Sequence, residues 1–138
     1  MANALYDHGR QGFLTKQIDW MNDDIRASLV KNTYAPNLAN DQYYDVTVAS
    51  YAVTTPVAIG SKSSTAGIAG GDPTGTVFTA VPPGSTVGYI VIYDNSPASN
   101  KPLIACIDTA SGGPISMPTS GLDVLVQWAT TGNLIFKL

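Results

Sequence analysis

The sequence predicts an all-β fold, a jelly-roll-like sandwich or small barrel, with a short N-terminal helical arm. Apolar runs rich in Thr, Val, Ile and Tyr recur at spacings of roughly 8 to 16 residues, with turn residues between them. All ten acidic residues are Asp, which prefers turns, and Glu, a good helix former, is absent. Only the first part of the chain shows a helical pattern. We therefore expect an arm at 1–22 and a single β body at 23–138.

The arm begins with a predicted helix over residues 3–14, for which Asn3 is a candidate N-cap. The side chains that fall near one side of this helix are Ala4, Leu5, Gly9, Gly12 and Phe13. Each glycine weakens a helix by about 1 kcal/mol relative to alanine. The helix is therefore expected to be marginal alone and to become ordered through contacts.

In the first half of the body, the sequence predicts three strands and two loops. Residues 25–30 alternate apolar and polar side chains, as in a half-buried strand. A loop over 32–42 leads to a long predicted strand at 43–53 and a short one at 57–59. The Gly-, Ser- and Thr-rich segment 60–75 is expected to be either a mobile hairpin or a flexible excursion.

In the second half of the body, the sequence predicts further strands and two hairpins. A strand at 76–81 precedes a Pro-Pro-Gly turn. The runs at 85–93 and 103–108 flank a polar turn and are expected to pair with each other. The runs at 122–128 and 134–138 form the clearest predicted hairpin. The chain then has about seven to nine strands in all.

The sparse, scattered charges argue against a nucleic-acid partner, and the short apolar runs argue against a membrane span. Charged residues are 12% of the chain, about half of the usual share, and the net charge is -3. The seven Lys and Arg are scattered from Arg10 to Lys137 and form no basic cluster. No apolar run approaches the length of a membrane span, and no signal-peptide pattern is expected at the start. So few charges are typical of a surface that partners cover or that hydroxyl groups form.

No residue is predicted to be catalytic, to bind a cofactor or to ligate a metal, so we do not expect an enzyme. His8 is the only imidazole and has no nucleophile motif beside it. Cys106 is the only cysteine and lies in an apolar run, which excludes an intrachain disulfide and fits a reducing cytosol. The pair Asp23 and Asp24 lacks metal-ligand spacing, and 60–64 departs from a phosphate-binding loop.

Aromatic residues leave two alternatives open. The tyrosines could form a ligand-stacking face or be ordinary half-buried strand residues; they are Tyr43, Tyr44, Tyr51, Tyr89 and Tyr93. Trp20 and Met21 could anchor a contact with a partner, or the arm could simply pack on its own sheet.

Several stretches together resemble a family of small virion proteins of tailed bacteriophages. The stretches are Met-Ala-Asn-Ala-Leu-Tyr-Asp-x-Gly-Arg-x-Gly-Phe-Leu at 1–14, Ile18-Asp-Trp20, Asp24-Ile-Arg26, Leu29-Val30, Val91-Ile-Tyr93, Leu103-Ile-Ala105, Ile107-Asp-Thr109 and Ile135-Phe-Lys-Leu138. Lys31-Asn32 departs from the acidic turn of that pattern. The resemblance implies a capsid cement or decoration protein with a jelly-roll-like body.

This resemblance also implies partners and a location. The major capsid protein and further copies of the chain, as a homodimer or homotrimer, are the expected partners, on the outer capsid surface of a virion assembled in the host cytoplasm. The expected interface residues are Leu5, Tyr6, Phe13, Trp20 and Met21. Deleting 2–21 is then expected to leave a folded body that no longer decorates shells. The alternative is a tail or fibre component of the virion, which could bind a receptor.

Overall fold

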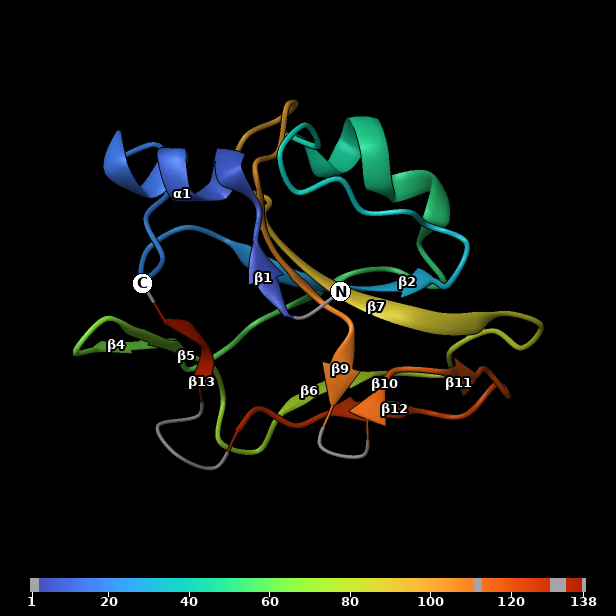
Figure 1. Ribbon diagram of the computed structural model, residues 1–138. Helices are drawn as coiled ribbons and strands as arrows, with labels where there is room; N and C mark the ends of the chain where they lie inside the picture. Colours follow the sequence, from blue (N-terminus) through green and yellow to red (C-terminus); the bar gives the residue numbers. More distant parts are fainter. Residues whose placement is uncertain (1–2, 111–112, 130–133, 138) are drawn as a thin grey trace.

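The main sheet of the computed structural model has six antiparallel strands, and the model describes residues 3–110, 113–129 and 134–137 (Figure 1). In spatial order its strands are β1 (Ala4–Leu5), β8 (Leu103–Ile107), β7 (Thr86–Asp94), β2 (Ile25–Lys31) and β3 (Val57–Ala58), and β11 (Met117–Pro118) also pairs with β7. The all-β prediction is confirmed. The described strands form open sheets and do not close into a barrel.

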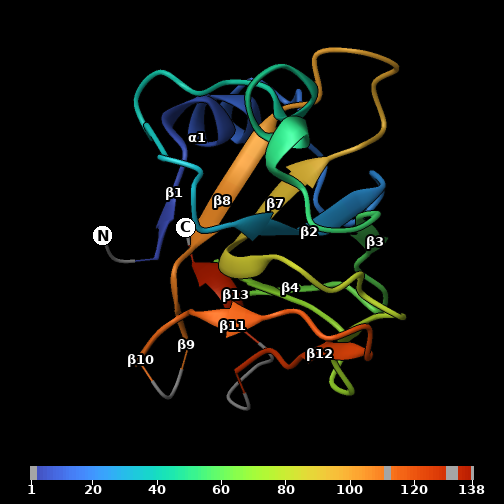
Figure 2. The ribbon, with the colours of Figure 1, turned by 90° about the vertical axis from the view of Figure 1, so that its right-hand side faces the viewer.

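A layer of smaller sheets lies across one face of the main sheet (Figures 1 and 2). It holds the sheet of β4 (Ser63–Thr65), β5 (Ile68–Gly70) and β13 (Leu134–Lys137), the ribbon of β6 (Thr76–Phe78) and β12 (Val124–Val126), and the hairpin of β9 (Thr109–Ala110) and β10 (Gly113–Pro114). All these pairs are antiparallel. The arrangement is that of a β-sandwich.

The central strands β2, β7 and β8 are covered on both faces. β2 pairs with β7 from Ile25 opposite Asp94 to Lys31 opposite Val87. Ala27 and Leu29 point into the interlayer core, whereas Ser28 and Val30 are equally buried on the other face. The strand expected over 25–30 is therefore confirmed, but the expectation that only one of its faces is buried is wrong. Ser28 is polar but buried, because its hydroxyl is hydrogen-bonded to the Tyr44 hydroxyl at 2.8 Å.

The predicted helix over 3–14 is only partly present. Residues Ala4–Leu5 form strand β1 on β8, and the helix α1 spans Asp7–Leu14. Asn3 does not cap this helix, whose N-cap residue is Tyr6. Instead, the Asn3 side chain donates to the Thr109 carbonyl at 3.0 Å and accepts from the Asp108 and Thr109 amides. These bonds fix the start of the chain to the end of β8.

Helix α1 lies very close to β8 because of a glycine. A Cβ at Gly9 would lie 2.6 Å from the Leu103 carbonyl oxygen and 2.8 Å from the Ile104 Cα, both backbone atoms of β8. The helical Gly9 thus allows the helix axis to approach the strand, and α1 covers this part of the sheet (Figure 2).

We expect Gly9→Ala to destabilise the fold by roughly 1 to 3 kcal/mol, although alanine is the better helix former. The added methyl group must displace the backbone of β8. Thermal unfolding followed by circular dichroism would measure this. Gly60→Ala is the matched control, because its Cβ would meet only the Asp72 carboxylate at 3.8 Å. Equal melting temperatures for the two variants would contradict the close contact.

The strand predicted at 43–53 is wrong. Tyr44–Val48 forms a π-helical turn, η1, and Ala49–Tyr51 a 3-10 turn, η2. Tyr44 and Val48, four residues apart, are buried, whereas Val46 between them is 71% exposed. This burial follows helical spacing, although the same residues alternate in sequence like a strand.

One of the two predicted hairpins is confirmed. β7 and β8 pair, as expected for 85–93 and 103–108. The pairing of 122–128 with 134–138 is wrong, because β12 pairs with β6 and β13 with β5. The turn residues 130–133 of that predicted hairpin lie outside the described residues. In 60–75, the hairpin alternative holds, since β4 pairs with β5 through Ala66 and Gly67, both at positive φ.

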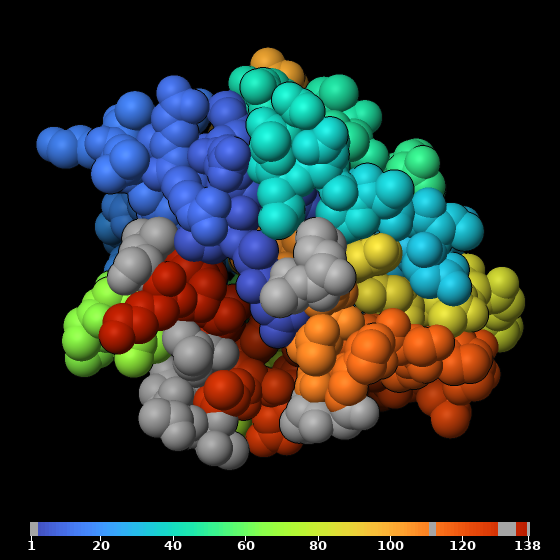
Figure 3. Space-filling model, in the orientation of Figure 1, coloured from blue at the N-terminus to red at the C-terminus, as the bar shows by residue number. Residues whose placement is uncertain are grey.

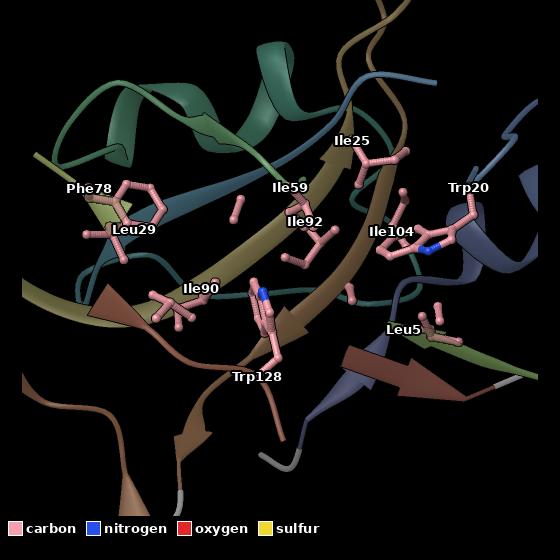
Figure 4. Packing of buried hydrophobic residues seen from close by; sticks show 14 of the residues in the cluster. Leu5, Trp20, Ile25, Leu29, Ile59, Phe78, Ile90, Ile92, Ile104 and Trp128 are labelled. Atoms are coloured by element: carbon pink, nitrogen blue, oxygen red, sulfur yellow. The ribbon is translucent and has the colours of Figure 1, made fainter. Parts of the chain in front are cut away.

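Two hydrophobic clusters hold the layers together. The larger one lies between the main sheet and the opposite layer, and it contains Leu5, Trp20, Phe78 and Trp128 (Figure 4). The second lies on the other face of the main sheet, under α1 and the 32–53 segment. It is rich in tyrosine, with Tyr6, Tyr34, Tyr44 and Tyr93 all buried.

Candidate functional site

Three of the five expected interface residues are internal. Leu5 and Trp20 are 7% exposed and Tyr6 is fully buried. The Tyr6 amide donates to the Ile104 carbonyl at 2.9 Å, and the Trp20 indole nitrogen donates to the Ser63 carbonyl at 3.1 Å. The arm therefore packs on its own sheet, the alternative that the sequence left open. These three side chains are not surface contacts of the folded chain.

The other two expected interface residues are closer to the surface. Phe13 is partly buried, with its ring 5.8 Å from that of Phe136, and Met21 is 48% exposed. The structure adds Leu14, at the end of α1, which is 86% exposed. Leu14 is not among the expected interface residues. The sequence does show it as a large apolar side chain that lies outside the apolar side of the predicted helix. Figure 3 shows the N-terminal segment (blue) in one continuous surface with the remaining chain.

A second apolar surface lies on the β6–β12 ribbon. Val77 and Leu125 are cross-strand partners that point away from the core and are 48% and 54% exposed. Leu122, just before β12, is 70% exposed. We call these three residues the ribbon patch. The sequence could not indicate it, because β6 and β12 are distant in the chain and were not expected to pair.

The tyrosines do not form an open stacking face. The Tyr44 and Tyr93 rings stack on each other at a centroid distance of 3.8 Å, and Tyr34 contacts the rings of Tyr51 and Tyr89. The Tyr34 hydroxyl donates to the Asp41 carboxylate at 2.7 Å. These side chains stabilise the layer over the main sheet, which agrees with the ordinary structural alternative.

His8 and Cys106 lie apart from any recognisable catalytic group among the described residues. The His8 ring packs edge-on against Tyr43, 4.9 Å between centroids, and its buried Nε2 has no hydrogen-bond partner there. Cys106 is fully buried in β8, and burial raises the pKa of its thiol to about 12. A protonated, enclosed thiol is a poor nucleophile. The expectation that the chain is not an enzyme stays a prediction.

Asp94, at the end of β7, is a fully buried carboxyl group. Its Oδ1 accepts from the Ser96 amide at 2.9 Å, and its Oδ2 has no partner among the described hydrogen bonds. Burial, and then the neighbouring Asp23 carboxyl, raise the pKa of Asp94 to about 7. Cations near this strand end have other partners: Lys62 donates to the Asp23 carbonyl, Arg26 pairs with Asp24 at 3.0 Å, and Lys101 donates to the Asn95 and Pro97 carbonyls.

A cavity with a volume of about 990 Å³ lies between the two layers of the sandwich. Leu29, Val87, Ile90 and Ile107 of the main sheet line one side. Met117 of β11 also lines it, and the opposite layer contributes Val124, Val126, Trp128 and Ile135. Sequence reasoning gave no indication of this cavity, because its walls come from runs that are distant in the chain.

No protein-family model, curated protein or solved structure matches this chain. Within the described ranges, no group of three or more His, Cys, Asp or Glu side chains is placed to hold a metal ion. None of the described helices has the length and apolar character that a membrane crossing requires.

Proposed function

We propose that this chain is a structural virion protein that binds the outside of a tailed-phage capsid and bridges neighbouring capsomers. The ribbon patch is the observation that supports this proposal most. Two large apolar side chains that are cross-strand partners on one short ribbon, and a third just before it, are exposed in a chain with few charges. Apolar side chains that gather on an exposed face are typical of an interaction site. Contact by shape and apolar burial is what such a surface can offer to a shell.

The geometry of the apolar side chains favours bridging. Leu14 ends helix α1 on one side of the main sheet, and the ribbon patch lies in the layer on the opposite side (Figure 1). One copy therefore presents apolar surface in two directions. Two weak contacts with linked subunits raise the overall affinity without new chemistry. In this proposal the major capsid protein receives one contact, and a neighbouring capsomer or a second copy of the chain, as a dimer or trimer, receives the other.

We expect Leu122→Asp with Leu125→Asp to reduce rebinding to stripped shells by at least about tenfold, because two charges would be desolvated at the interface. The fold should persist, since both side chains point outward. Sedimentation of the purified variant with stripped particles measures this. Val46→Asp is the matched control, because Val46 is 71% exposed on η1, away from the ribbon. Full rebinding of the double variant would contradict the role of the ribbon patch.

A tail or fibre component remains the second candidate function, because it too would be a β-rich, charge-poor virion protein. Copy number separates the two. Hundreds of copies per particle on a stoichiometric gel of purified particles would support the shell, and a handful would support the tail.

A further inference from the structure

We propose that the cavity between the two layers binds an uncharged, predominantly apolar ligand. Its volume of about 990 Å³ is at the upper end of the range for small-molecule sites, roughly 300 to 1,000 Å³. It is partly open and is lined by both layers of the sandwich, so a ligand would contact side chains of both layers.

The lining determines the class of ligand. The described residues that line the cavity include no Asp, Lys, Arg or His. Its polar members are few, and one of them, Asn3, already uses both its side-chain nitrogen and oxygen in hydrogen bonds to the Asp108–Thr109 backbone. A charged group would lose its hydration inside the cavity without gaining an ion-pair partner. An aliphatic chain or a neutral aromatic compound would lose nothing comparable.

The exposure of the lining explains why an apolar ligand is favoured. The cavity is partly open, and at its wall Met117 and Val124 are half-buried and Leu125 is exposed. A ligand that covers these side chains removes apolar surface from water, which is favourable in proportion to the area covered.

Titration of the full chain with N-phenyl-1-naphthylamine, an uncharged fluorescent probe, tests the proposal. We expect a saturable fluorescence increase at one probe per chain, and competition by a neutral fatty alcohol. Met117→Trp and Val124→Phe should weaken binding at least tenfold, since both side chains line the cavity and are half-buried. Leu122→Trp, an indole added outside the cavity lining, should bind as the wild type does.

Two outcomes would overturn the proposal. One is the absence of saturable binding to the folded wild-type chain. The other is unchanged binding in whichever of the cavity-filling variants folds, as judged by circular dichroism. A measurement on the wild type alone complements the variants: nuclear Overhauser contacts between the probe and the methyl groups of Leu29, Ile90 and Val126 are expected. Contacts confined to Val77 and Leu122, which do not line the cavity, would place the probe on the outer surface and would also overturn the proposal.

Discussion

Deleting residues 2–21 is expected to unfold the chain, and not to leave a folded body. The deletion removes four large buried side chains, Leu5, Tyr6, Ile18 and Trp20. At roughly 1.5 to 3 kcal/mol for each, the lost burial is comparable to the whole stability of a domain, about 5 to 15 kcal/mol. It also removes β1, which covers the outer edge of β8. Urea unfolding of the 22–138 fragment should show no cooperative transition.

The matched control changes the same segment without touching the core. Leu14→Ser with Met21→Ser alters two exposed side chains and should shift the unfolding free energy by less than about 0.5 kcal/mol. A fragment that unfolds cooperatively, with a midpoint near that of the full chain, would contradict the structural role of the first 21 residues. The prediction that an arm can be removed would then stand.

Replacing Asp94 by asparagine is expected to change how stability depends on pH. The pKa of Asp94 is raised from an ordinary value near 4 to about 7, so between these values the folded chain holds a proton that the unfolded chain releases. The stability that this bound proton gives to the folded chain is fully present below about pH 4. It is lost as the pH rises through about 7. Asp94→Asn removes the titration. Relative to the wild type, it should gain stability from about pH 4 to about pH 8, by roughly 4 kcal/mol at most.

Urea unfolding at a series of pH values measures this difference. Asp72→Asn is an informative control, because hydrogen bonds from Thr74 lower the pKa of the exposed Asp72 carboxyl, so its smaller effect should have the opposite sign. The Asp23 carboxyl, the charged group that raises the pKa of Asp94 together with burial, is unchanged in both variants. Parallel pH profiles for Asp94→Asn and the wild type would show that Asp94 is ionised in the folded chain.

The central sheet could be predicted because its signals are local. The runs that form β2, β7 and β8 are rich in β-branched residues, and a short polar turn separates β7 from β8. The errors occur where tertiary contacts decide the structure. At 43–53 the alternation of Tyr44, Val46 and Val48 fits a strand, but packing of Tyr44 on Tyr93 accompanies a helical turn. No local pattern indicates that β12 pairs with β6, because the partners are far apart along the chain: Val124 lies opposite Phe78, and Val126 lies opposite Thr76.

The candidate surface could be predicted only in part. The sequence indicated that large apolar residues near the start matter, but it could not distinguish Trp20, which enters the core, from Met21, which stays exposed. That distinction depends on the contact of the Trp20 ring with Phe136, at the other end of the chain. Likewise, the ribbon patch and the cavity exist only after β6 and β12 have paired.

Heating of purified particles, with and without this chain, tests the central proposal most directly. The chain is stripped with mild denaturant, and half of the stripped particles are incubated with the purified chain before DNA release is followed with an intercalating dye. If the chain cements the shell, stripped particles release DNA at a lower temperature, and re-addition of the chain restores the original value. Identical release temperatures for native, stripped and restored particles would contradict the proposal.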